Sequence, residues 1–266
     1  MEPMTIREIM DAVGGKLLGE FGDINRMVGR VETDSRTIHA GSLFVPLVGE
    51  RFDGHAYINA ALEGGAAGCF TQRERESYLP GKFYIKVDST QRALRDLAKY
   101  YKKKFPIPVV ALTGSVGKTT TKDMVAAVLG EKYRVLKTEG NLNNEIGVPM
   151  TLLRLSGEHE IAVLELGMNH AGEIDYLSAL VEPDVVLMTN IGDSHIEHFG
   201  SREKILEAKS EIFHHVKSGA FVVINGDDPL LNTLPGKLPY AFTRVGAGEG
   251  LDYRAEGLVS DGKSHM

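Results

Sequence analysis

Residues 109–120 read VVALTGSVGKTT, and this stretch decides the fold. The apolar run Val109 to Thr113 is typical of a buried strand, and a helical pattern follows from Thr119 to Leu129. In a glycine-containing loop between a strand and a helix, backbone N–H groups and the helix N-terminus can surround phosphate. The stretch therefore predicts a phosphate-binding loop in an α/β domain.

The loop supplies the candidate nucleotide-binding residues, which are consecutive: Thr113, Gly114, Ser115, Val116, Gly117, Lys118, Thr119 and Thr120. Lys118 can reach the terminal phosphates, and Thr119 can offer a hydroxyl to magnesium. The usual pattern has a glycine where this chain has Leu112, so the loop is a variant. A simple turn containing Gly-Lys-Thr is the alternative, and the flanking strand and helix argue against it.

Strands alternate with helices after the loop. Apolar runs predict strands at 134–137, 161–166 and 185–190, and an amphipathic helix is predicted over 201–218 with Ser201 as its N-cap. This alternation favours a doubly wound, mostly parallel sheet.

The front of the chain predicts a small α/β domain, with strands at 42–47 and 83–87 and helices at 55–62 and 90–101. Residues 102–108 then combine a charge run with two prolines, which restrict the backbone. We therefore expect an N-terminal domain over residues 1–104 and a second domain over 105–266.

Composition limits the classes of protein that the chain can represent. Its 266 residues, 42% of them hydrophobic, are enough for two domains with cores. A net charge of −6 gives no general basic field for nucleic acid or an anionic membrane. We see no secretory signal and no apolar run of about 18 residues, and we expect a cytoplasmic monomer. The single cysteine, Cys69, is predicted to be a buried thiol without a role.

Polar residues at two further strand ends can complete a site. Glu165 lies at the end of the 161–166 strand, where a carboxylate can hold magnesium beside phosphates, although an ordinary hydrogen-bonded acid is the alternative. His195 follows the 185–190 strand, and open α/β sheets bind ligands beyond the carboxyl ends of their strands. A loop histidine is usually structural, but beside Lys118 and Glu165 it becomes a candidate metal ligand.

Several strings together resemble the Mur ligase family: TGSVGKTT at 113–120, GNLNNEIGVP at 140–149, ELGMNHAGEI at 165–174, TNIGDSHIEHFGS at 189–201 and EAKSEIF at 207–213. The likeness is greatest to the type that joins D-alanyl-D-alanine to UDP-N-acetylmuramoyl-tripeptide. Upstream, TDSR at 33–36, GSLFV at 41–45 and DGH at 53–55 look like the UDP-binding amino-terminal domain of such ligases.

The resemblance implies ATP and magnesium as cofactors and assigns roles by position. Lys118 and Thr119 would bind the phosphates and magnesium, while Glu165 and His195 would serve the metal sites. Lys209 matches a lysine that the family carries as a carbamate, which would be an anionic ligand for a second magnesium. From the sequence alone it is a solvated helix lysine. The resemblance makes Lys118, Lys209 and His195 the candidate catalytic residues.

Further binding residues follow from the same resemblance. Asn141 or Asn144 would lie near the phosphates, and the sequence does not choose between them. Ser35 and Arg36 are the candidates for UDP, because a guanidinium pairs well with phosphate oxygens. A turn with a surface salt bridge is the alternative at these two positions.

The expected function is that of an ATP-dependent ligase of peptidoglycan precursor synthesis. It would join D-alanyl-D-alanine to UDP-N-acetylmuramoyl-tripeptide through an acyl phosphate, without nucleic-acid or membrane partners. The family has a carboxy-terminal domain and a Gly-x-His-Asn region that we do not find in this sequence, and we expect both to be absent.

Three alternatives stay open: the related ligase type that adds the third amino acid, a phosphate-loop kinase or GTPase switch, and a nucleotide-binding fragment without catalysis. A GTPase would carry an Asn-Lys-x-Asp string, which the sequence lacks. Phosphate release that depends on a UDP-muramoyl peptide would distinguish a ligase from a kinase.

Overall fold

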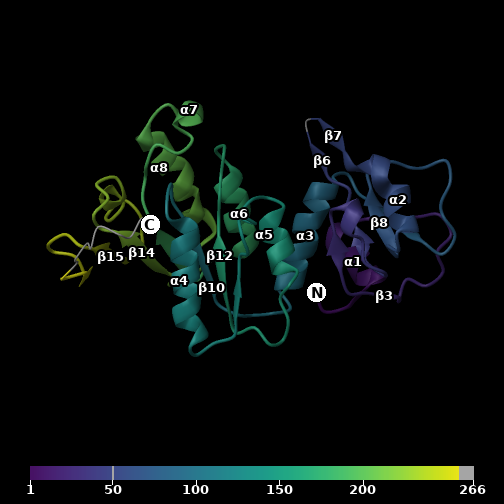
Figure 1. The fold of residues 1–266 in the computed structure, drawn as a ribbon, viewed down its shortest axis with the longest axis horizontal. Coiled ribbons are helices and arrows are strands. Elements are labelled where there is room, and N and C mark those ends of the chain that lie inside the picture. The colour runs from purple at the N-terminus through teal and green to yellow at the C-terminus, as the bar shows by residue number, and fades with distance from the viewer. Residues whose placement is uncertain (50, 258–266) are drawn as a thin grey trace. The chain divides into compact units, whose positions relative to one another are not determined.

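The computed structural model describes residues 1–49 and 51–257, and the chain divides into two compact units (Figure 1). Unit 1 comprises Met1–Ile107 and Glu145–Glu160, and unit 2 comprises Pro108–Asn144 and the chain from Ile161 onward.

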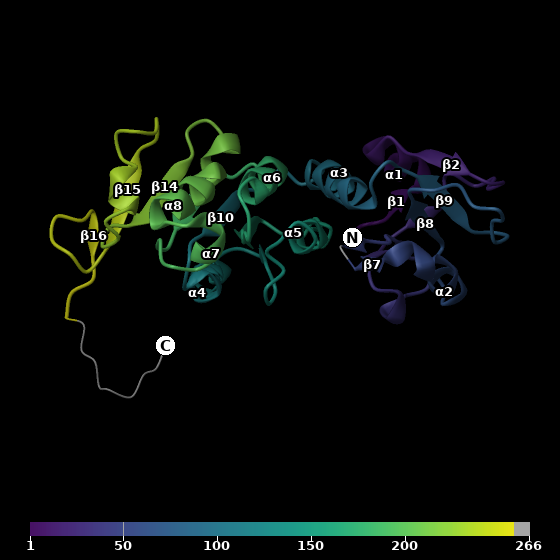
Figure 2. The same cartoon turned by 90° about the horizontal axis from the view of Figure 1, so that it is seen from above.

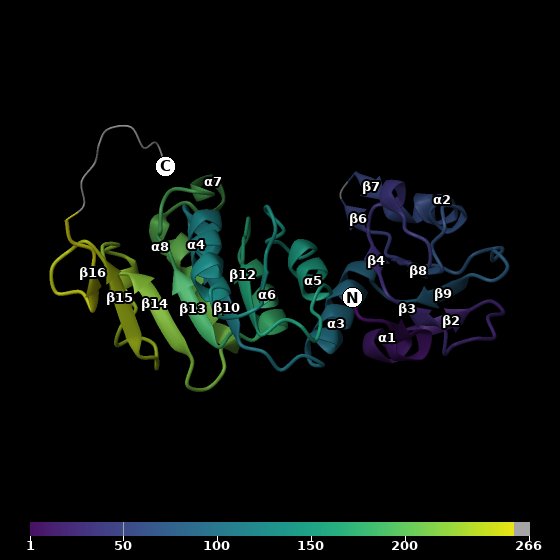
Figure 3. The same ribbon diagram turned by 60° about the horizontal axis from the view of Figure 1, so that its bottom comes forward.

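Unit 2 is built on a seven-stranded parallel sheet with the order β11-β12-β10-β13-β14-β15-β16. Its strands are β10 (Val109–Thr113), β11 (Val135–Lys137), β12 (Ile161–Glu165), β13 (Val185–Met188), β14 (Phe221–Asn225), β15 (Phe242–Gly246) and β16 (Tyr253–Arg254). Figure 3 shows β12, β10 and β13 to β16 side by side in this order. The predicted parallel sheet is confirmed.

Helices cover both faces of this sheet, so the doubly wound prediction is also confirmed. They are α4 (Lys118–Gly130), α6 (Glu173–Val181), α7 (Ile196–Phe199) and α8 (Arg202–Ser210), with the short 3-10 helices η3 (Glu211–His215) and η4 (Leu231–Thr233). From β10 the chain crosses through α4 to β11, and from β12 it crosses through α6 to β13, which lies in the opposite direction along the strand order. Because both crossovers are right-handed and run in opposite directions, α4 and α6 cover opposite faces of the sheet. Figure 2 shows these two helices on either side of β10. The direction of the connections reverses at β10, so the loops after β10, β12 and β13 lie next to one another at the carboxyl ends of these strands.

The predicted helix over 201–218 is correct only in its first half. Ser201 caps α8, because its hydroxyl accepts a hydrogen bond from the Lys204 N–H at 3.3 Å. After α8 the chain tightens into η3. The Ile212 carbonyl there accepts a 2.7 Å hydrogen bond from the Ser178 hydroxyl of α6, so packing against α6 replaces a continued α-helix.

Unit 1 contains a five-stranded sheet with the order β2-β9-β8-β5-β4, in which only β2 is antiparallel to its neighbour. Its strands are β2 (Lys16–Leu18), β4 (Val31–Glu32), β5 (Leu43–Phe44), β8 (Gly68–Thr71) and β9 (Phe83–Lys86). Two small pairs join β1 (Met4–Thr5) to β3 (Met27–Val28) and β6 (Val48–Gly49) to β7 (Phe52–Asp53). The helices are α1 (Ile6–Val13), α2 (Ile58–Glu63), α3 (Thr90–Lys102) and α5 (Gly147–Leu152), with η1 (Ser35–Thr37) and η2 (Gly54–Tyr57). This is the small α/β fold that the sequence predicts.

The division into units differs from the predicted domains in two places: unit 1 extends to Ile107 and not to residue 104, and it includes a later segment. Residues 145–160, which the sequence analysis assigned to the second domain, cluster with unit 1. The buried Tyr101 of α3 gives the physical reason, since its hydroxyl donates a 2.6 Å hydrogen bond to the Leu155 carbonyl. The same hydroxyl accepts a hydrogen bond from the Glu2 N–H at 2.6 Å, so one side chain ties three segments together.

Cys69 is buried in the core of unit 1, as predicted, and desolvation raises the pKa of its thiol to about 12. Among residues 1–49 and 51–257, no helix has the length and apolar character needed to cross a membrane.

Candidate functional site

The phosphate loop connects β10 to α4 through two glycines with left-handed backbone. Gly117 is the N-cap of α4 with φ +78°, and Gly114 has φ +154°. A Cβ at Gly114 would lie 1.9 Å from the Thr189 hydroxyl oxygen, so the position also requires glycine for a close approach. The Lys118 ammonium turns back onto the loop and donates to the Gly114 carbonyl at 2.9 Å. Burial lowers the pKa of Lys118, and the nearby Glu165 carboxylate opposes this shift.

Thr119 and Glu165 lie together at the strand ends. The Thr119 hydroxyl donates to one Glu165 carboxylate oxygen at 2.9 Å, and the Asn143 amide donates to the other at 2.7 Å. Glu165 is only 2% exposed, and its backbone N–H donates to the Thr138 hydroxyl at 3.0 Å. Two hydrogen bonds thus hold the carboxylate, a third holds the backbone of the same residue, and the charge of Lys118 lies nearby.

Asn143 is a site residue that the sequence analysis missed. Asn141 and Asn144 were the candidates, and both are exposed, whereas the side chain between them reaches Glu165. The Asn143 carbonyl also accepts from the Gly167 N–H at 2.8 Å, which joins this loop to the segment after β12. The string GNLNNEIGVP contains the signal, but a sequence does not show which asparagine turns toward a strand end.

Lys209 is buried in α8, with 2% of its surface exposed. Desolvation lowers the pKa of its ammonium to about 7, and the positive charge of Lys118 adds to the shift. Within the described residues, its side chain forms no hydrogen bond or ion pair. The solvated-lysine alternative is therefore wrong: Lys209 is an interior cation placed near a second cation.

His195 occupies the N-cap of α7 with φ +66°, a conformation uncommon for a residue with a side chain. Its side chain is half-buried and forms no hydrogen bond in the part of the chain that the structure describes. In that same part, no three His, Cys, Asp or Glu side chains converge as a metal site. The structure thus brings Lys118, Thr119, Glu165 and Lys209 together and leaves His195 without a link to them.

The candidate UDP residues line a cavity of about 390 Å³ in unit 1. Its lining includes Ser35 and Arg36 together with Phe52 and Tyr57, whose rings stack with centroids 5.5 Å apart. The Arg36 guanidinium makes a bidentate pair with Asp34, at 2.9 and 2.7 Å, and these hydrogen bonds lower the pKa of Asp34 to about 2. The surface salt bridge that was the alternative reading is present, and it lies at the rim of a pocket.

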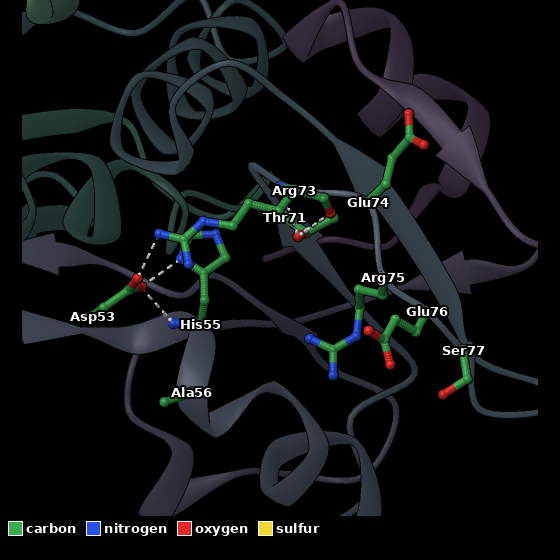
Figure 4. A pocket seen from close by; sticks show the side chains of 9 residues that line it. All are labelled: Asp53, His55, Ala56, Thr71, Arg73, Glu74, Arg75, Glu76 and Ser77. Carbon is green, nitrogen blue, oxygen red and sulfur yellow. Dashed lines mark hydrogen bonds and ion pairs between the residues drawn. The ribbon is translucent and has the colours of Figure 1, made fainter.

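A second cavity of unit 1, of about 470 Å³, lies at the end of β8. Figure 4 shows His55 and Arg73 converging on Asp53 at its edge. His55 Nε2 accepts from the Gln72 N–H at 3.0 Å, so Nδ1 carries the proton and donates to Asp53 at 2.7 Å. The DGH string at 53–55 therefore builds a partly buried structural link between η2 and the end of β8.

The open parallel sheet whose order reverses at β10, with a glycine loop after that strand, defines the class: a phosphate-loop α/β protein. Residues 112–264 match the sequence profile of the Mur ligase middle domain, and residues 28–102 match that of the Mur ligase family catalytic domain. The chain belongs to the Mur ligase family.

Several relatives are similar over most of this chain. The UDP-N-acetylmuramoyl-tripeptide–D-alanyl-D-alanine ligase of Bacillus subtilis (strain 168) is 46% identical, over 85% of this chain and 50% of its own length. A crystal structure of MurF from Acinetobacter baumannii is 36% identical, with a TM-score of 0.87, over 95% of this chain and 55% of that one. The MurF ligase from Thermotoga maritima in complex with ADP is 37% identical, with a TM-score of 0.76, over 84% and 51%. The chain spans about half the length of the curated relatives that it matches.

Proposed function

We propose that this chain forms the UDP-substrate-binding and ATP-binding parts of a ligase that joins D-alanyl-D-alanine to UDP-N-acetylmuramoyl-tripeptide. The observation that carries the proposal is the cluster of Lys118, Thr119 and Glu165 at the strand ends of a Mur ligase fold. The name and identity of the Bacillus subtilis relative support the substrate assignment, and the ADP complex of the Thermotoga maritima relative supports nucleotide binding.

The donor set at this cluster fits magnesium. A buried carboxylate and a threonine hydroxyl are hard oxygen ligands, and the amide of Asn143 orients the carboxylate. When bound, magnesium would supply positive charge beside the phosphate oxygens, and Thr119 and Glu165 would hold it. Their present hydrogen bond of 2.9 Å would give way to shared coordination.

Lys209 is suited to become a carbamate. A pKa of about 7 leaves a substantial fraction of neutral amine near neutral pH, and the neutral amine is the form that attacks carbon dioxide. The neutral nitrogen forms a bond to the carbon of carbon dioxide and one proton is released, so an uncharged amine becomes an anion. Starting from the buried ammonium, two protons are released in all. Beside Lys118 this reverses a repulsion into an attraction, because the two groups then carry opposite charges.

The chemistry follows from charge and positioning. The substrate carboxylate attacks the γ-phosphorus of ATP, the bond to the ADP oxygen breaks, and an acyl phosphate forms. Lys118 leaves the Gly114 carbonyl to pair with phosphate oxygens, and the N–H groups of the first turn of α4 hold the phosphoryl group. The amine of D-alanyl-D-alanine then attacks the acyl carbon and loses a proton, and phosphate departs.

Unit 1 would bind the UDP end of the substrate. In the 390 Å³ cavity, the exposed rings of Phe52 and Tyr57 offer a stacking surface for a base, and Ser35 and Arg36 offer donors for phosphate oxygens. Arg36 keeps part of its guanidinium turned away from Asp34 and can therefore contact a second anion.

Replacement of Lys118 by alanine tests the nucleotide-binding part. We expect Lys118→Ala to weaken the binding of magnesium-ATP by about 10- to 150-fold, because a charge-assisted hydrogen bond is lost. Calorimetric titration measures the affinity, and Lys132→Ala, which changes an exposed lysine of the same unit, is the matched control. Equal ATP affinity in the wild type and Lys118→Ala would remove the phosphate loop from the proposal.

A further inference from the structure

The apex of the phosphate loop is held by a side chain from the neighbouring loop. The Asn190 carboxamide, just beyond β13, accepts the N–H of Val116 at 2.9 Å and donates to the carbonyl of Val116 at 3.0 Å. The Thr189 hydroxyl donates to the same carbonyl at 2.8 Å. Both polar backbone groups of a residue whose surface is 64% exposed are therefore paired with the loop after β13.

These bonds fix the two peptide groups on either side of Val116. In a trans peptide the C=O and the following N–H point in opposite directions. Because Asn190 and Thr189 hold the Val116 carbonyl on their side, the N–H of Gly117 is directed away from them. That N–H immediately precedes the first turn of α4, whose N–H groups also lack intrahelical partners. The contact thus sets the direction of a donor next to the proposed phosphate site.

Asn190 is itself held firmly. Its carbonyl accepts from the Ser115 N–H at 2.9 Å, and the Gly192 N–H donates to the Ser115 hydroxyl at 2.8 Å. The following N–H, that of Ile191, donates to the buried Asp228 carboxylate at 2.7 Å. The support for the loop therefore extends from β10 through the end of β13 to the segment after β14.

We propose that Asn190 is a positioning residue for nucleotide binding: it orients the peptide groups of the phosphate-loop apex so that their N–H donors are ready for phosphate. This rests on the proposed binding of ATP. The variant loop has no glycine at position 112. The two hydrogen bonds between the Asn190 side chain and the Val116 backbone fix the conformation of its apex from outside the loop. The opposite role is that of a latch, by which we mean that Asn190 accepts the Val116 N–H and the nucleotide has to displace it in order to bind that N–H.

Titration of the full chain with magnesium-ADP separates these roles. If Asn190 positions the loop, Asn190→Ala should raise the Kd for ADP about tenfold. This change corresponds to about 1.4 kcal/mol of binding free energy, the typical net contribution of one hydrogen bond. Asn232→Ala removes another asparagine hydrogen bond to backbone in the same unit and should leave the Kd unchanged. Asn190→Ala that binds ADP as tightly as the wild type, or more tightly, would overturn the proposal.

Asn190→Asp provides a second variant of almost the same size. It keeps an acceptor for the Val116 N–H, loses the donor to the Val116 carbonyl and adds negative charge, so we expect ADP binding at least as weak as in Asn190→Ala.

Amide hydrogen exchange gives an independent readout: the Val116 N–H should be protected in the wild type both with and without ADP, and exposed in Asn190→Ala. Loss of this protection when ADP binds to the wild type would instead indicate a latch. A wild type that binds no ADP contradicts the proposed function, whereas a wild type and Asn190→Ala with equal affinity contradict only the role of Asn190.

Discussion

The environment of Lys209 destabilises its ammonium form and favours the neutral, nucleophilic amine. A buried ammonium without a counter-charge costs free energy, and the nearby Lys118 increases this cost. The folded chain therefore disfavours the charged form, as the pKa of about 7 expresses. The proposed conversion of the amine to a carbamate would remove the repulsion from Lys118 and place an anion beside it.

The pKa shift of Lys209 predicts a pH dependence of stability. Its pKa is about 7 in the folded chain and 10.5 in the reference state, so between these values the unfolded chain binds more protons. The contribution of Lys209 to the free energy of unfolding then rises with pH across that window. In buffer free of carbon dioxide, Lys209→Met should be more stable than the wild type at about pH 6.5, and this advantage should narrow by about 2 kcal/mol at about pH 9.

Urea denaturation at the two pH values measures this difference. Lys132→Met, which changes an exposed lysine of the same unit, is the matched control. A stability difference between Lys209→Met and the wild type that stays constant over this range would mean that Lys209 titrates normally.

Sequence reasoning identified Lys209 only through family resemblance. Its neighbours Ile205 (i−4) and Ile212 (i+3) are apolar, so helical spacing already places Lys209 on the apolar face of α8, a signal that the solvated-lysine interpretation did not use. Which groups surround the ammonium follows only from the fold. The same limit applies to Asn143 and Asn190, whose roles depend on loops that meet only in the folded sheet. Glycine and lysine positions in the phosphate loop were predictable because their chemistry is local in sequence.

At the scale of elements, hydrogen bonds of single side chains decide where segments pack. The hydroxyl of Tyr101 joins α3 to the Leu155 carbonyl and to the Glu2 N–H, and this helps to place residues 145–160 in unit 1. The apolar pattern of these residues predicts no such attachment, since strands and helices of one unit are usually consecutive in sequence. The strand ends of β10 and β12, in contrast, lie within a residue of their predicted positions.

Tyr101→Phe tests this attachment. The Leu155 carbonyl would lose its donor inside the protein, and an unsatisfied buried polar group costs about 1–3 kcal/mol. We expect the free energy of unfolding, from urea denaturation, to fall by that amount. Tyr100→Phe, which changes the preceding and partly exposed tyrosine, is the control and should be near neutral. Equal stability of Tyr101→Phe and wild type would show that other contacts hold the segment.

At the scale of the whole molecule, each unit carries one half of the proposed task. Unit 2 has the sheet edge where a nucleotide and magnesium would bind, and unit 1 has a pocket with aromatic rings and an arginine suited to UDP. The alternation of strands and helices made the fold of unit 2 predictable, because parallel sheets require crossover helices. The short strands of unit 1 gave only the class of fold, since runs of two residues carry little periodicity.

The proposed function assigns this chain to the D-alanyl-D-alanine-adding type and requires it to recognise the UDP-linked substrate of that type. Calorimetric titration of the purified chain with UDP-N-acetylmuramoyl-tripeptide, compared with UDP-N-acetylmuramoyl-dipeptide, tests it most directly. We expect the tripeptide to bind more tightly than the dipeptide. Tighter binding of the dipeptide would assign the chain to the type that adds the third amino acid, and no binding of either compound would contradict the proposed substrate.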